Sequence, residues 1–107
     1  MEVDVSWSDL QAVIKASNVM GLPEVAFVGE NGTVFLRAVD TDNPTADQFG
    51  VEIGETSDDF SLILKTQNLK LMPYDYRVKL SSRGISCFES ADVTYYIALQ
   101  AKSVYKK

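Results

Sequence analysis

The sequence predicts an α+β fold in which one plan of helix and strands occurs twice. Residues from about 3 to 54 read as a strand, a helix and three strands, and residues from about 60 to 102 as a strand, a shorter helix and three strands. Because both units share one small domain, residues 1–107, we expect two helices side by side on one face of curved antiparallel sheet.

Composition sets the broad class of the protein. A chain of 107 residues, 46% hydrophobic and 23% charged, is long enough for one globular domain with its own core. No apolar run approaches the ~20 residues of a membrane span, the first residues do not resemble a signal peptide, and Cys87 has no second cysteine to pair with. We therefore expect a cytoplasmic protein that does not bind a membrane.

The first helix has clear start and stop signals. Ser6 with Asp9 three residues later forms a capping pattern, and Gly21 is the expected C-cap. Leu10 and Val13 recur at helical spacing and are expected in the core. The opposite face carries a polar stripe with almost no acid: Ser8, Gln11, Lys15 and Asn18.

Alternating apolar residues predict the strands of the first unit. Asn31-Gly32 predicts a tight hairpin, since both residues tolerate positive φ. The predicted strands and loops are Glu24 to Val28, Thr33 to Val39, an acidic loop from Asp40 to Asp47, a strand from Phe49 to Ile53 and a turn from Gly54 to Asp59.

The second unit begins with the alternating run that starts at Phe60. Thr66 is a plausible N-cap for a short helix that Pro73 ends, and Leu69 is its expected core residue. The expected strands after it are Tyr76 to Leu80, Ile85 to Glu89 and Val93 to Ala101, followed by a frayed tail.

Charge is unevenly distributed along the chain. The formal net charge is −5, yet the segment from Lys65 to Arg83 holds five cations against one anion, Asp75. A basic segment on an acidic protein favours contact with a polyanion, and we expect DNA. The sequence contains no pattern typical of a recognition helix, so we do not expect binding to a specific base sequence.

Four short motifs, in this order, resemble the C-terminal domain of the sliding clamps of T-even-type bacteriophages. They are D-L-Q at the start of the first helix, N-L-K-L-M-P in the second, Y-R-V-K-L after it and Y-Y-I-A-L-Q-A near the end. The resemblance covers residues from about 6 to 103. It implies the DNA clamp fold and the function of a polymerase processivity factor, which is not an enzyme and needs no cofactor or metal.

In that family six such domains close into a ring around duplex DNA, with the helices lining the hole. The resemblance therefore implies contact with DNA phosphates, without reading of bases, by six side chains: Lys15, Lys70, Lys65, Gln11, Asn18 and Gln67. It also implies other clamp domains as partners, and polymerase and clamp-loader peptides that insert apolar side chains into a pocket. The expected pocket residues are Ala101, Val104, Tyr105, Val39 and Pro44. A phage-encoded clamp would act in the cytoplasm of an infected bacterium.

Other interpretations of the sequence remain open. One is an adaptor with the clamp fold that binds proteins and does not encircle DNA. Another is a small enzyme that uses the acidic residues Asp40, Asp42, Asp58 and Asp59, although no nucleophile motif or metal-ligand spacing supports it, and the absence of histidine argues against zinc sites and histidine-based catalysis. The chain is either a C-terminal piece of a two-domain clamp or a one-domain clamp that would need six copies.

Overall fold

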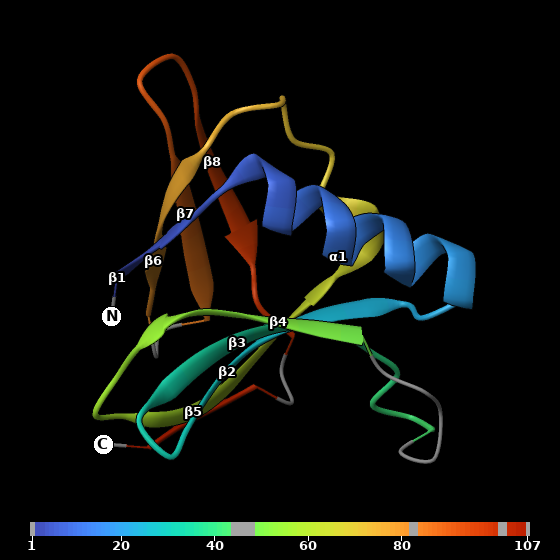
Figure 1. The fold of residues 1–107 in the computed structure, drawn as a ribbon, viewed down its shortest axis with the longest axis vertical. Coiled ribbons are helices and arrows are strands. Elements are labelled where there is room, and N and C mark those ends of the chain that lie inside the picture. Colours follow the sequence, from blue (N-terminus) through green and yellow to red (C-terminus); the bar gives the residue numbers. More distant parts are fainter. Residues whose placement is uncertain (1, 44–48, 82–83, 101–102, 107) are drawn as a thin grey trace.

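The computed structural model describes residues 2–43, 49–81, 84–100 and 103–106, and it contains two antiparallel sheets and one α-helix (Figure 1). The elements in chain order are β1 (Glu2–Val5), α1 (Trp7–Met20), β2 (Glu24–Glu30), β3 (Thr33–Val39), β4 (Phe49–Glu55), β5 (Asp59–Lys65), the 3-10 helix η1 (Thr66–Asn68), β6 (Tyr76–Leu80), β7 (Ile85–Glu89), β8 (Thr94–Ala98) and β9 (Val104–Lys106).

The two predicted units exchange their first strands. One sheet has the order β1-β6-β7-β8 and the other the order β4-β3-β2-β5-β9. Thus β1 of the first unit pairs with β6 of the second, and β5 of the second unit pairs with β2 of the first, both antiparallel. The predicted α+β class and its duplicated strand plan are confirmed, and the exchange joins the two units into one domain.

Helix α1 begins and ends where the sequence predicts. The side-chain oxygen of Ser6 accepts a hydrogen bond from the N–H of Asp9 at 3.2 Å, and Gly21 ends the helix in the left-handed conformation with φ 68°. Asp75 provides a second cap, because its carboxylate accepts from the N–H of Trp7 at 2.7 Å. The loop before β6 is thereby tied to the start of the helix.

The main core lies between α1 and the two sheets. Leu10 and Val13 of the helix are fully buried. Alternate residues of the strands face them, among them Val25 and Phe27 on β2, Val34 and Leu36 on β3, Leu62 and Leu64 on β5, and Val78 and Phe88 in the other sheet. The opposite face of β2, β3 and β5 holds a small separate apolar cluster of Ala26, Val39 and Ile63. This second face, which we call the outer face, lies away from α1.

The prediction of a second α-helix is wrong. The chain forms only the three-residue η1, and the segment from Leu69 to Asp75 is irregular. This segment must carry the chain from one sheet to the other, and an irregular chain covers more distance per residue than a helix with its 1.5 Å rise. Thr66 is not an N-cap, because its buried hydroxyl forms a hydrogen bond with the hydroxyl of Ser17 on α1. Leu69 is nevertheless buried in the core, as expected.

The other predicted elements differ from the structure mainly at the ends of strands. The Asn31-Gly32 hairpin is confirmed, with φ values of 52° and 83°. The expected last strand from Val93 to Ala101 is shorter, Thr94–Ala98. The expected frayed tail is wrong at Val104–Lys106, which pairs with β5 as β9. That pairing is a tertiary contact, so a local pattern of three residues could not predict it.

Candidate nucleic-acid interface

The polar stripe of α1 lies on the solvent side of the helix. Ser8, Gln11, Lys15 and Asn18 are all exposed, because Leu10, Val13 and Ser17 turn the other face into the core. Within the described part of the chain, Lys15 makes no ion pair with an acidic side chain. Its ammonium group is therefore available to an external anion.

Two more predicted residues follow β5, close to the C-terminal half of the helix. Gln67 lies within η1 and Lys70 shortly after it, and both side chains are exposed. Lys70, like Lys15, has no acidic partner among the described residues. The structure thus places two lysines without an acidic partner in the described chain, one on α1 and one on the segment that follows η1.

A buried pair of hydroxyl groups joins α1 to η1. The side-chain oxygens of Ser17 and Thr66 are 2.7 Å apart, and the Ser17 hydroxyl donates to the carbonyl of Leu22. Since Ser17 has a single hydroxyl proton, Thr66 must donate to Ser17. The N–H of Thr66 donates to the carbonyl of Pro23 at 3.0 Å. These bonds fix the end of the helix against the segment that carries Gln67 and Lys70.

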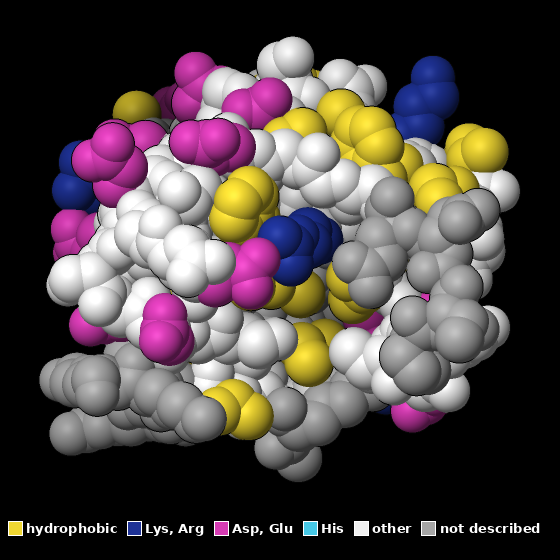
Figure 2. All heavy atoms as spheres, turned by 60° about the horizontal axis from the view of Figure 1, so that its bottom comes forward, with side chains coloured by type: hydrophobic (Ala, Val, Ile, Leu, Met, Phe, Trp, Pro, Cys, Tyr) yellow, Lys and Arg dark blue, Asp and Glu magenta, His cyan; other side chains and the backbone are white. Residues whose placement is uncertain are grey.

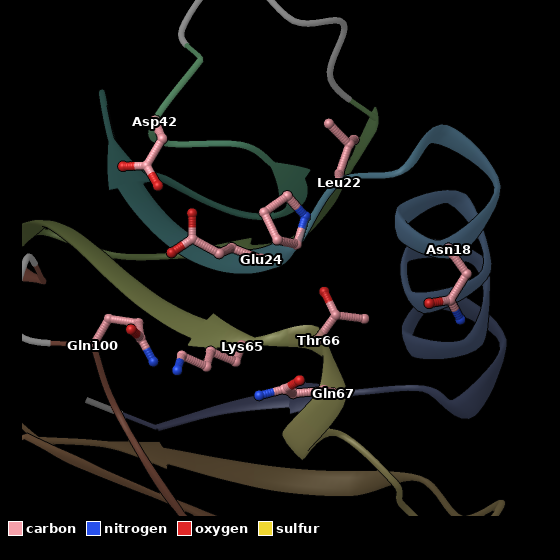
Figure 3. Close-up of a pocket in the computed structure, with 9 residues that line it drawn as sticks. Asn18, Leu22, Glu24, Asp42, Lys65, Thr66, Gln67 and Gln100 are labelled. Atoms are coloured by element: carbon pink, nitrogen blue, oxygen red, sulfur yellow. The ribbon is translucent and has the colours of Figure 1, made fainter.

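Lys65 lies on a different side of the sheet from the other two lysines. Strand alternation places it with Ser61 and Ile63 on the outer face, where Glu24 is its cross-strand neighbour. It lines a pocket of about 460 Å³, here called the polar pocket, whose residues are Asn18, Leu22, Pro23, Glu24, Asp42, Lys65, Thr66, Gln67 and Gln100. Figure 3 shows the Lys65 side chain directed toward Gln100, with Asn18 apart on the helix.

Two further cations of the basic segment are compensated within the fold. Arg77 on β6 forms ion pairs with Glu2 at 3.0 Å and Asp4 at 3.3 Å, both on β1. Lys79 pairs with Glu89 on β7 at 3.6 Å. Arg83 lies outside the described residues. Part of the local positive charge that suggested DNA is therefore explained by cross-strand pairing in the sheet that contains β6.

The residues predicted for the partner pocket are only partly placed. Val39 lines a pocket of about 430 Å³ on the outer face, here called the outer pocket, with Ala26, Val28, Glu30, Arg37, Asp40, Thr41, Ser61 and Ile63. Val104 lines a neighbouring pocket of about 370 Å³ that shares Val28, Glu30 and Ser61 with it. Ala101 and Pro44 lie outside the described residues, and for Tyr105 the described feature is its backbone pairing with Phe60.

Apolar side chains form the floor of this region, and charged groups form its walls. On the face that Figure 2 turns forward, apolar side chains lie in hollows near the middle beside basic and acidic side chains. Arg37 pairs with Glu30 at 2.8 Å and lies over the ring of Phe35. The sequence held a signal for this face, because β2 is apolar at successive positions, which is typical of a strand buried on both sides.

Neither a metal site nor a membrane-spanning helix is found among the described residues. They hold no group of three or more histidine, cysteine, aspartate or glutamate side chains that could bind a metal ion. Within the same residues no helix has the length and apolar character needed to cross a membrane.

Comparison with known proteins gives a consistent result over nearly the whole chain. The profile of a protein family described as gp45 sliding clamp, C terminal, matches residues 2–101. A sliding clamp of Vibrio phage KVP40 is 33% identical over 104 residues, covering 94% of this chain and 47% of the relative. A sliding clamp of Escherichia phage RB69 is 24% identical over 110 residues, covering 95% of this chain and 48% of the relative. The chain spans about half the length of these curated relatives.

Proposed function

Since the chain belongs to the gp45 sliding clamp family, matching its C-terminal domain, we propose that it helps to form a ring around duplex DNA and tethers a DNA polymerase to it. The observation that carries this proposal is the family match over residues 2–101, together with the duplicated two-sheet plan found in the structure. The action of the domain is that of a sliding support for the polymerase, without chemistry of its own.

In this proposal the solvent side of α1 and the segment after β5 face the DNA. Lys15 and Lys70 supply positive charge with no acidic partner within the described chain, while Gln11, Asn18 and Gln67 are polar spacers that hold water. Few cations separated by neutral groups suit a protein that must slide, because each phosphate contact stays weak and independent of base sequence. Lys65, on the outer face, belongs to this surface only through its place beside Gln67 in the polar pocket.

The proposed polymerase and clamp-loader contact is the outer pocket with its neighbour at Val104. Its apolar floor of Ala26, Val39 and Ile63 suits short apolar side chains, as expected for a peptide segment rather than a small charged ligand. Because α1 packs on the opposite face of the same strands, DNA and partner peptide would occupy opposite sides of the domain.

Neighbouring clamp domains would join through the ends of the sheets. In the described chain β4 and β8 each end a sheet, and they are the last strands of the two repeated units. Both carry exposed aromatic side chains, Phe49 on β4 and Tyr96 on β8, the latter 72% exposed. An edge strand with unpaired backbone groups and exposed apolar side chains is suited to pairing with another sheet.

A comparison of two double variants in the full-length protein tests the DNA-facing surface. Lys15→Gln with Lys70→Gln removes two lysines of the proposed DNA-facing surface that have no acidic partner among the described residues, whereas Arg77→Gln with Lys79→Gln removes the same charge from ion-paired positions. We expect the first pair to shorten the products of processive DNA synthesis. It should also lower the slope of log affinity against log salt by about 0.9 for each phosphate that the protein no longer neutralises.

The control pair should leave processivity unchanged, since exposed ion pairs contribute only about 0–1 kcal/mol to stability. Equal losses in both pairs would show that total charge matters and the helix surface does not. Normal processivity in the first pair would refute the assignment of Lys15 and Lys70 to the DNA side.

A further inference from the structure

Glu24, the first residue of β2, is a buried carboxylate in a region where exposed acids are common. The residue is 4% exposed, and it is the one buried charged residue in the described part of the chain. Burial of a carboxylate is unfavourable unless hydrogen bonds replace its water. Here one carboxylate oxygen accepts from both the N–H and the hydroxyl of Thr41, at 3.1 and 2.5 Å.

These bonds hold the turn that follows β3. Within the turn, the N–H of Asn43 donates to the carbonyl of Asp40 and the N–H of Asp42 to the Asp40 carboxylate, both at 3.1 Å. Such local bonds shape the turn but do not fix it relative to the sheet. The bonds from Thr41 to Glu24 do so, because Glu24 belongs to the neighbouring strand β2.

The same turn forms part of two pockets. Asp40 and Thr41 line the outer pocket, and Asp42 lines the polar pocket together with Glu24. Figure 3 shows Glu24 and Asp42 on one side of the polar pocket. A shift of the turn relative to β2 would therefore change the outer pocket, in which the Glu24 carboxylate itself takes no part.

We propose that Glu24 is a positioning residue for the partner site, acting through Thr41. The inference rests on the proposed function of the outer pocket as a peptide site. β-branched and aromatic residues are favoured in strands, and burying a carboxylate costs free energy, so extension of β2 alone does not explain a buried acid at Glu24. Hydrogen bonds to a charged acceptor are directional and strong, so they hold one geometry of the turn where apolar packing would allow several.

The experiment measures binding of a labelled synthetic peptide carrying the C-terminal residues of the DNA polymerase from the same genome. Glu24→Gln keeps the size of the side chain but removes its charge, and Thr41→Val removes the hydroxyl donor. We expect each variant to raise the Kd about 3–10-fold, the size of one weakened hydrogen bond, and to speed hydrogen exchange at the Thr41 amide. Thr41→Ser, which keeps both donors, should leave the Kd and the exchange rate at the parent's values. Glu52→Gln, the same chemical change at an exposed site on β4, is the matched control.

Each outcome bears on the proposal. Weaker binding by Glu24→Gln and Thr41→Val, with binding like the parent's in Thr41→Ser, supports it. Unchanged binding by Glu24→Gln and Thr41→Val, where the parent chain binds the peptide, overturns the positioning role but leaves the proposed function intact. Absence of binding by the parent chain overturns the partner site itself and this role with it. Thr41→Val decides the question if Glu24→Gln fails to fold, because Thr41 lies in a turn outside the core.

Discussion

Substitution of Gly29 by alanine tests the packing between β2 and β5. Gly29 is directly paired with Phe60 across the two strands. A Cβ at Gly29 would lie 2.4 Å from one atom of the Phe60 ring and 2.8 Å from the backbone oxygen of Asp58, whereas ordinary contact begins at 3.4 Å. The ring would therefore have to retreat by about 1 Å, and Phe60 is buried in the main core.

The expected cost follows from two opposing terms. Overpacking of a core typically costs about 1–3 kcal/mol, and replacing glycine by alanine returns about 0.4–1 kcal/mol by restricting the unfolded chain. We expect a net loss of about 1–2 kcal/mol in the free energy of unfolding, which lowers the Tm by about 4–9 °C for a domain of this size.

Urea denaturation followed by circular dichroism measures this loss. Gly50→Ala on β4 is the comparison, because its Cβ would lie 2.8 Å from the Cγ of Arg37, a side chain at the surface, and would not meet a ring of the main core. We expect Gly50→Ala to cost less than Gly29→Ala, because Arg37 is partly exposed and can shift toward solvent, whereas Phe60 is buried in the core. The double variant Gly29→Ala with Phe60→Leu should recover part of the packing term. A Gly29→Ala protein as stable as the parent would show that Phe60 does not need the space above the glycine.

Two further predictions concern buried hydroxyl groups. Ser17→Ala should lower the free energy of unfolding by about 1–3 kcal/mol in urea denaturation, because it leaves the Thr66 hydroxyl without its acceptor. The double variant Ser17→Ala with Thr66→Val should lose less. If Ser17→Ala alone loses no more than the double variant, this reasoning is contradicted. Burial raises the pKa of the Tyr76 phenol above its ordinary value of about 10, so its contribution to stability is complete below pH 10 and is lost as the pH rises through the folded-state pKa. At pH 7 Tyr76→Phe should be less stable than the parent, because it lacks the hydrogen bond to the Met72 carbonyl. Between pH 9 and about 11 it should lose less stability than the parent. Exposed Tyr96→Phe is the control, and an equal alkaline loss in Tyr76→Phe and the parent would show that Tyr76 is not the titrating group.

The sequence was sufficient to predict those parts of the fold that depend on local signals. The Ser6 cap, the Gly21 stop and the Asn31-Gly32 hairpin each depend on a few adjacent residues, and all three are found in the structure. The prediction of a second helix was wrong because the segment after η1 has to connect the two sheets, and because the hydroxyl of Thr66 is bonded to Ser17, 49 positions away, and does not cap a helix. No local pattern contains that contact.

The candidate site, too, was predictable only where it depends on local patterns. Helical spacing correctly placed Lys15 on the exposed side of α1, but its contact with DNA remains a proposal. Strand alternation shows that Lys65 lies on the outer face, and the ion pairs of Arg77 and Lys79 depend on β1 lying beside β6. Sequence alone could not reveal the proposed role of Glu24, because an acid at the start of a strand is ordinarily exposed, whereas here it is buried and bonded to the turn after β3.

The exchange of first strands between the two units also constrains how the chain can fold. The hairpins of β2 with β3 and of β6 with β7 join neighbouring segments and can form early. The pairing of β1 with β6, like the bond between Trp7 and Asp75 that are 68 positions apart, must wait until a long loop has closed. Neither half can complete a sheet without a strand from the other, so a protein cut between β4 and β5 should regain the native state only when both fragments are mixed.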